Sequence, residues 1–339
     1  MWPSGIDDIS KTNPRLGGEW MPTGLMSKAV RLAVTIGLLA TLLFVVADPR
    51  EVLALVADMS LSALVGAVLL SLADRFVMAY KWWLLLRARA LTVNLWTAVR
   101  SYLASSLYGL VLPVTVGADA VRVLALRHAG MMEVTASIIV ERGLGVLAMG
   151  SVALLSCLLL ASTVTEFEIQ SLTLWLGGGV IVMTILFAAS LHLAERWANA
   201  HESEAPSRLQ EAVKAFGHYR RLPRLLTVFY ALSVGESLLS AVIGYVVAVG
   251  LGASIPFSVF VATVPLALAS ARLPISLGGF GVQEASFVFL AGLVGVPNTT
   301  ALSIMLVSDL AMLLALLPSA FDSSMLSLRR QATAATPGS

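Results

Sequence analysis

Charged side chains inside apolar stretches are the residues of this sequence that could do chemistry. One segment reads Gly117-Ala-Asp119-Ala-Val-Arg122, and Glu141-Arg142 follows in the next apolar run. Each such charge costs roughly 2.5–3.5 kcal/mol at the centre of a membrane helix. Arginine stays charged and binds phosphate through two parallel hydrogen bonds. The pattern predicts an anion site inside a membrane, and structural pairing such as Arg122 with Glu141 is the alternative.

Further charges follow the same rule. Glu236 and Asp309 lie in the middle of apolar runs, and Arg272 and Glu284 flank a second glycine-rich segment. A buried charge has to face an opposite charge or a wet cavity. Arg272 is a candidate phosphate ligand or a partner of Glu284. Four acids are candidates for proton coupling or for charge balance, and the sequence leaves both roles open: Glu141, Glu236, Glu284 and Asp309.

The composition places these residues in a membrane protein. Hydrophobic residues make up 58% of the 339-residue chain and charged residues 12%, and the mean hydropathy is +0.88. Soluble domains carry about 25% charged residues. The apolar runs are long and continuous, which favours helices over a barrel. The net charge of +2 argues against nucleic acid, and neither a metal nor another cofactor is predicted, because Cys157 is the only cysteine and the four histidines lack ligand spacing.

The pattern predicts an all-α, polytopic bundle with about six full spans and two interrupted regions. A tail at 1–27 precedes the transmembrane domain at 28–320, which contains a basic loop at 195–224, and a second tail covers 321–339. In that loop Leu209, Val213 and Phe216 fall at helical spacing, which fits an amphipathic helix on an anionic leaflet or a solvated loop equally well. The predicted spans are 28–47, 61–80, 134–160, 172–194, 225–249 and 300–320.

Basic residues orient the chain. Lys28 and Arg31 flank the first span on its N-terminal side, Lys81 and Arg87 follow the second span, and both termini are predicted to be cytoplasmic. Acidic or uncharged loops are placed outside, including 48–60. Because the neighbouring spans start and end on the sides that these charges fix, the interrupted regions 98–128 and 256–296 must each return to the side from which they start. Each is either two short spans or a re-entrant hairpin, and their short halves favour hairpins.

The two interrupted regions share a Pro/Gly break and are entered from opposite sides. The first break holds Gly117, and the second reads Pro274-Ile-Ser-Leu-Gly278-Gly279-Phe-Gly281. Oppositely oriented broken helices point to a transporter site near the bilayer midplane. A helix that begins inside the membrane presents free N–H groups, and glycine lets a phosphate approach them.

The ordered motifs resemble the flippase-like membrane family that includes the transmembrane region of lysylphosphatidylglycerol synthase. The matching segments are 102–113, Gly117 to Arg122, Glu141-Arg142-Gly143, and the break that ends at Glu284; together the resemblance spans about 30–320. It implies movement of an anionic or polyprenyl-linked lipid between leaflets of a prokaryotic plasma membrane. Ala118 stands where the family often has a second glycine.

The leading hypothesis is a non-enzymatic flippase or transporter for a phospholipid or polyprenyl-linked lipid. The lipid bilayer is then its environment and its source of substrate. No P-loop pattern is present, so ATP is not the expected energy source. Two alternatives stay open: a membrane-embedded transferase acting on a lipid phosphate, with Asp119 or Glu141 as base, and a non-transporting partner of a separately encoded lipid-modifying enzyme.

Overall fold

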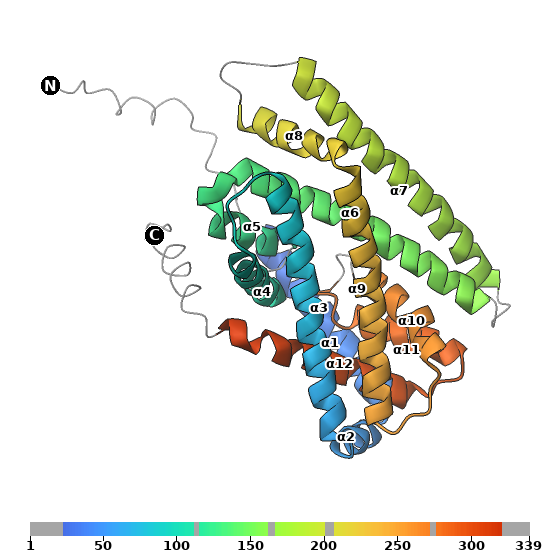
Figure 1. The fold of residues 1–339 in the computed structure, drawn as a ribbon. Coiled ribbons are helices and arrows are strands. Elements are labelled where there is room, and N and C mark those ends of the chain that lie inside the picture. The colour runs from blue at the N-terminus through green and yellow to red at the C-terminus, as the bar shows by residue number, and fades with distance from the viewer. Residues whose placement is uncertain (1–22, 112–114, 162–166, 201–206, 272–275, 321–339) are drawn as a thin grey trace, which may run out of the picture.

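The computed structural model is a bundle of α-helices (Figure 1). It describes residues 23–111, 115–161, 167–200, 207–271 and 276–320, which contain twelve α-helices and no strand. A π-helical turn at Leu42–Val46 continues the first helix, and a 3₁₀ turn at Tyr219–Arg221 follows the eighth. The α-helices are α1 (Thr23–Thr41), α2 (Pro49–Ala57), α3 (Leu61–Ala88), α4 (Leu95–Val111), α5 (Thr115–Ala125), α6 (Arg127–Ala161), α7 (Phe167–Ala200), α8 (Arg208–His218), α9 (Pro223–Gly250), α10 (Phe257–Ser270), α11 (Val282–Leu293) and α12 (Asn298–Ala320).

The predicted spans are confirmed as helices. Among the described residues, α3, α6, α7, α9 and α12 are long and apolar enough to cross a membrane, and α1 with α2 makes a sixth candidate if the bent pair is one span. The helices exceed the predicted ranges at several ends. The largest extension is in α3, which runs to Ala88 rather than to residue 80.

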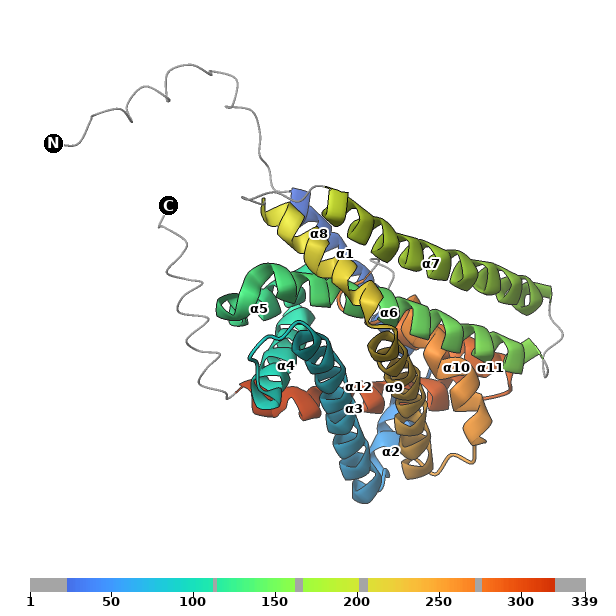
Figure 2. The ribbon, with the colours of Figure 1, turned by 45° about the horizontal axis from the view of Figure 1, so that its top comes forward.

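Helices α3 and α9 form an antiparallel pair (Figures 1 and 2). At one end the N–H of Ser60, before α3, donates to the carbonyl of Gly250 at 3.1 Å. At the other end the hydroxyl of Tyr219, before α9, donates to the carbonyl of Leu85 at 3.0 Å. The start of α3 and the end of α9 therefore lie at one end of the bundle, and the end of α3 and the start of α9 lie at the other end.

The two interrupted regions are helical hairpins that enter from opposite ends. Each consists of two packed helices, α4 with α5 and α10 with α11. The first follows the end of α3 and the second follows the end of α9, and these ends lie on opposite sides. Leu126, just after α5, and Val93, just before α4, belong to one buried cluster, so the first hairpin returns to its starting side. The inverted arrangement expected from the charge pattern is thus present.

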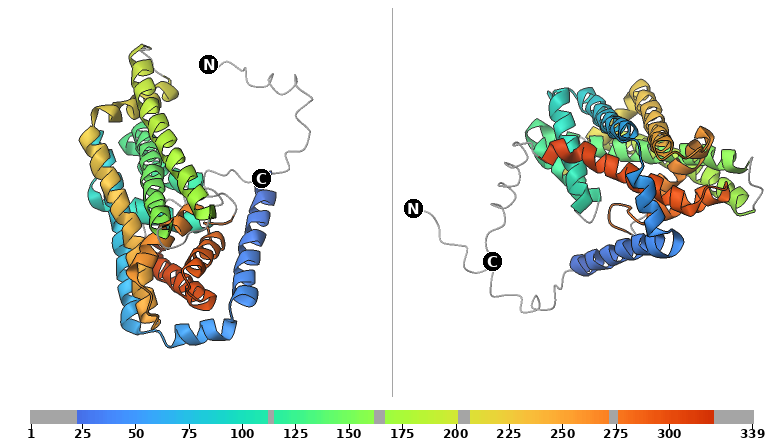
Figure 3. Two further views of the ribbon diagram at one scale, coloured as in Figure 1. Left: turned by 90° about the vertical axis from the view of Figure 1, so that its right-hand side faces the viewer. Right: turned by 90° about the horizontal axis from the view of Figure 1, so that it is seen from below.

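Helix α1 stands apart from α3 and α9, and α2 connects it to the bundle (Figure 3). The pair is bent by 92°. The segment 48–60 was expected to be a loop, but Asp48 caps a helix by accepting from the N–H of Arg50 at 2.8 Å, and Pro49 occupies the first helical position. Aspartate and proline in these positions are helix start signals, so the acidic residues of the segment mark a helix rather than an open loop.

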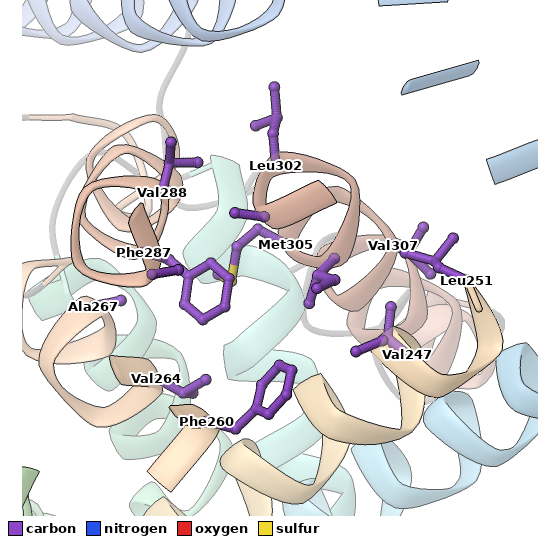
Figure 4. Packing of buried hydrophobic residues seen from close by; sticks show 14 of the residues in the cluster. Val247, Leu251, Phe260, Val264, Ala267, Phe287, Val288, Leu302, Met305 and Val307 are labelled. Atoms are coloured by element: carbon purple, nitrogen blue, oxygen red, sulfur yellow. The ribbon is translucent and has the colours of Figure 1, made fainter. Parts of the chain in front are cut away.

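The core near the second hairpin is aromatic and aliphatic (Figure 4). Phe260 of α10 stacks against Phe287 of α11 with ring centroids 6.3 Å apart. Met305 of α12 and Val247 of α9 belong to the same buried cluster. This packing ties the second hairpin to both neighbouring spans and holds one wall of the polar interior in place.

Helix α8 is present in the basic loop, and it packs on protein. Ser207 and Gln210 cap each other, which is a strong helix start. Its inner face contacts α6 and α7, where Ala215 and Gly217 are buried, while Leu209 is exposed. The amphipathic helix is therefore confirmed, and its apolar side is covered largely by the bundle.

Gly217 is the position where α8 approaches α7 most tightly, and substitution there tests the contact. A Cβ at Gly217 would lie 2.7 Å from the backbone nitrogen of Glu195, which cannot rotate away. We expect Gly217→Ala to destabilise the protein by about 1–3 kcal/mol, as overpacking does. The matched control is Gly178→Ala on α7, where nothing lies within 4 Å. Thermal unfolding in detergent measures the stability of both variants. Equal unfolding temperatures for the two variants would contradict the tight contact at Gly217.

Candidate functional site

A cavity of about 510 Å³ lies between the two hairpins. Its size is within the range of about 300–1,000 Å³ that small-molecule sites occupy. Side chains from both hairpins and from α1, α3, α6, α9 and α12 line it. Among its lining residues are most of the predicted site residues: Asp119, Arg122, Glu141, Arg142, Glu236, Gly278, Gly279 and Asp309.

Two arginines and two acids form one network on the α5–α6 side. Arg122 donates from Nη1 to Glu141 and from Nη2 to Asp119, each at 2.5 Å. Arg142 donates from Nε and Nη2 to the two oxygens of Asp119 at 3.1 and 2.7 Å. The four formal charges balance, so the network can stay ionised inside the bundle.

Arg122 is enclosed by aromatic rings. Its guanidinium lies 4.9 Å from the ring centroids of both Trp82 and Tyr102, and the residue is 1% exposed. The Tyr102 hydroxyl donates to Glu141 at 3.2 Å. The predicted pairing of Arg122 with Glu141 is confirmed. Trp82 is itself fully buried, and its N–H donates to the hydroxyl of Ser137 at 3.0 Å inside the bundle.

Arg142 differs from Arg122 in its access to the cavity. Its side chain is 38% exposed, compared with 2% for Arg122. Its hydrogen bonds to Asp119 use Nε and Nη2, so Nη1 is left without an acceptor in the described part of the chain. Of the two arginines in this network, Arg142 is therefore the one that can donate a hydrogen bond to an entering anion.

The α3–α9 wall carries a second buried ion pair. Lys81 is 4% exposed, pairs with Glu236, and donates to the hydroxyl of Ser233 at 2.9 Å. Lys81 was expected to mark the cytoplasmic end of a span, and this interpretation is wrong. Helix α3 continues through apolar residues to Ala88, and the ammonium stays inside because an acid on α9 neutralises it.

The glycine segment before α11 needs backbone conformations that only glycine adopts readily. Gly278, Gly279 and Gly281 have φ of 60°, 87° and 84°. A Cβ at Gly279 would lie 2.6 Å from that of Ala271. Gly278 and Gly279 line the cavity, whereas Gly281 packs against α1 and is not among the lining residues. The glycines are thus explained by chain conformation and by close packing.

Glu284 caps the start of α11. Its Oε2 accepts from the N–H of Gly281 at 2.6 Å, and the residue is fully buried. One of the donors that the sequence suggested for a phosphate is therefore taken by a side chain of the same helix. The neighbouring residue of α11, Gln283, donates to Asp309 of α12 at 3.2 Å, and both of these residues line the cavity.

Some predicted site residues fall where the structure gives no side-chain information. Arg272 lies outside the described residues, as do Pro113 and Pro274. Gly117 lies in the first turn of α5, and its surroundings are likewise outside the description. The pairing of Arg272 with Glu284 and the role of Gly117 therefore stay predictions.

The cavity also has polar walls beyond the predicted site residues. Arg31 and the neighbouring pair Asp74–Arg75, which are joined at 2.7 Å, line it. Much of the remaining polar surface comes from serine hydroxyl groups. Ser233, Ser237 and Ser240 lie within four residues of Glu236 in the sequence, and this spacing on one helix is the signal that could have found them. The serines that line the cavity are Ser71, Ser105, Ser106, Ser233, Ser237, Ser240, Ser276 and Ser308. In the described part of the chain, no group of three or more His, Cys, Asp or Glu residues is placed to hold a metal ion.

A polytopic helical membrane protein with a charged interior is the class that this fold and cavity define. Residues 29–319 match the model of the family described as the lysylphosphatidylglycerol synthase TM region. The chain belongs to this family, which confirms the resemblance seen in its motifs and places the protein in a membrane, with a role related to lipid. No curated protein and no solved structure matches the chain.

The buried network predicts that removing one arginine leaves an acid unpaired. We expect Arg122→Ala to lower the free energy of unfolding by about 3–5 kcal/mol, because Glu141 then lacks its cation in a buried site. The double variant Arg122→Met with Glu141→Gln removes both charges and should recover part of that loss. Denaturation in detergent micelles measures both variants. A single variant as stable as wild type would show that Glu141 needs no cation.

The second prediction of the site is that water reaches the cavity. In a Cys157→Ser background, Ser237→Cys on the cavity wall should react with a charged, membrane-impermeant thiol reagent. Thr184→Cys on α7 is the matched control, because it is exposed on an apolar helix surface that faces hydrocarbon. Mass spectrometry of the labelled protein gives the yield. Equal labelling of both positions would contradict a selectively wet interior.

Proposed function

We propose that the protein is a lipid flippase or transporter, which moves an anionic or polyprenyl-linked lipid between leaflets through the central cavity. The observation that carries this proposal is a cavity rich in charges and hydroxyl groups inside a bundle whose outer surface is apolar. A polar path of this kind lets a headgroup cross while the acyl or prenyl chains stay in the hydrocarbon. Family membership supports a lipid as the substrate.

Arg142 is the proposed phosphate ligand. It is held by Asp119 through two hydrogen bonds, so its position is fixed before any lipid arrives. The remaining Nη1 group can donate to a phosphate oxygen, and a charge-assisted bond of this kind contributes about 1.5–3 kcal/mol. Arg122 positions Asp119 and Glu141 from behind and has a supporting role. Gly278, Gly279 and Arg272 remain proposed contacts of the headgroup on the opposite wall.

The two hairpins supply the proposed route. They reach the cavity from opposite ends of the bundle, so either one can act as the barrier on its own side. Inverted pairs of broken helices around a midplane site support alternating access in secondary transporters. Location in a prokaryotic plasma membrane, with both termini in the cytoplasm, belongs to the same proposal.

The transferase alternative is less well supported by the geometry. Both oxygens of Asp119 accept hydrogen bonds from guanidinium groups, and Glu141 is committed to Arg122 and Tyr102. A general base needs an oxygen within reach of the proton that it removes. The carboxylates beside Arg122 are thus better suited to holding arginines in place than to proton abstraction.

Lipid flipping in proteoliposomes tests the proposal directly. The assay follows fluorescent phosphatidylglycerol, with fluorescent phosphatidylcholine as the comparison lipid. We expect wild type to flip the anionic lipid faster, and Arg142→Ala to slow that flipping about tenfold or more, because one charge-assisted hydrogen bond is lost.

Arg220→Ala is the matched control, since Arg220 lies outside the cavity and its partner Glu195 also pairs with Arg221. It should flip lipid at the wild-type rate. No flipping of either lipid by wild type would overturn the proposed function. Flipping that is unchanged in Arg142→Ala would keep the function and remove the assigned phosphate ligand.

A further inference from the structure

Two carboxyl groups meet at the edge of the cavity. Glu284 lies in the first turn of α11 and is fully buried, and Asp309 lies within α12 and lines the cavity. Gln283, the neighbour of Glu284 in the chain, donates to Asp309, and the two carboxyl groups lie close enough to interact. α11 packs against α12 along this region. The contact therefore joins the second hairpin to the last span.

Each carboxyl group uses one oxygen for an ordinary hydrogen bond and leaves the other unpaired. Glu284 Oε2 accepts from Gly281, and Asp309 Oδ1 accepts from Gln283. The remaining oxygens, Glu284 Oε1 and Asp309 Oδ2, are buried and have no donor within the described residues. An unpaired buried acceptor is costly. A proton held between the two groups would satisfy both oxygens at once.

Among the described residues, no charged side chain forms an ion pair with either of these carboxyl groups. The elements around Asp309 present six charged or titratable side chains to the cavity: Arg31, Asp74, Arg75, Lys81, Tyr102 and Glu236. Of these, Arg75 pairs with Asp74, and Lys81 pairs with Glu236.

We propose that Glu284 and Asp309 share one proton, and that binding and release of this proton through the cavity is coupled to lipid movement. The coupling rests on the proposed transport function, whereas the shared proton does not. Two carboxylates in contact at a buried site cannot both be ionised without strong repulsion. The bound proton therefore holds α11 against α12. Its release to cavity water leaves two negative charges, whose repulsion favours separation of the second hairpin from α12.

Infrared spectroscopy tests the shared proton without reference to transport. The purified wild-type protein near neutral pH should show the C=O stretching band of a protonated carboxyl, shifted in D₂O. We expect Glu284→Gln and Asp309→Asn each to shift this carboxyl band, because the remaining acid then bonds to an amide, and the double variant to remove it. Glu236→Gln is the matched control, because Glu236 is a cavity acid that pairs with a lysine and should be ionised, so the band should persist.

Gel filtration first establishes that each variant is folded. If one of the two dyad variants is not folded, the other is used for the test. Absence of the band from wild type, or an unchanged band in both single variants and in the double variant, would overturn the shared proton. Loss of the band in Glu236→Gln would also contradict the assignment, because it would place the proton elsewhere in the cavity.

Flipping of fluorescent phosphatidylglycerol under an imposed pH gradient tests the coupling. The wild-type rate should change several-fold with the gradient and return to its resting value with a protonophore, whereas the remaining rate of Asp309→Asn should not respond. A wild-type rate that ignores the gradient, or follows a sodium gradient instead, would overturn proton coupling. If wild type flips no lipid at all, the proposed function falls together with the coupling, and the infrared band still decides whether the dyad holds a proton.

Discussion

Charge inside hydrocarbon has to be met by opposite charge or by water, and this constraint governs how the interior of the protein is built. The network around Asp119 places two guanidinium groups against two carboxylates, and Lys81 meets Glu236 across α3 and α9. Breaking a buried pair by removing one partner costs far more than the pair contributes relative to apolar packing. These groups therefore fix which helices must be neighbours, and they restrict how the bundle can rearrange.

The same constraint explains why the backbone is broken where it is. Free N–H and C=O groups at helix ends inside a membrane are tolerated only next to protein or a wet cavity. In the second hairpin Gly278 and Gly279 line the central cavity, and their φ values allow the chain to turn there. Polar walls and broken helices thus depend on each other, since either alone would leave unsatisfied groups in contact with lipid.

Hydropathy and loop charge were enough to predict the spans, the two hairpins and their opposite orientations. These features depend on sums over many residues and on parity, which tolerate local errors. The helix at 49–57 was missed because acidic residues there were interpreted as loop residues, although Asp48-Pro49 is a start signal. The interior position of Lys81 could not be predicted, because its partner Glu236 lies 155 residues away in the sequence.

The sequence predicted most of the residues that form the candidate site, but it did not predict the role of each one. Arg122 and Arg142 look alike in the sequence, and only packing distinguishes them. Trp82 and Tyr102 enclose one guanidinium, and the other remains open to the cavity. Similarly, the sequence could suggest that the start of α11 binds an anion, but it could not show that Glu284 supplies a carboxylate of its own to Gly281.

The glycine segment connects the carboxyl pair to the first helix through a short series of contacts. Glu284 holds the N–H of Gly281, Gly281 packs against Leu38 of α1, and the N–H of Leu277 donates to Thr35 of α1 at 2.9 Å. Outside this region α1 has few neighbours, and its outer face is apolar and exposed. A change in the charge of the pair would therefore act first on the segment that holds α1 beside the cavity. Arg31 of α1 also lines the cavity, so the same series of contacts links the carboxyl pair to a cation of the cavity wall.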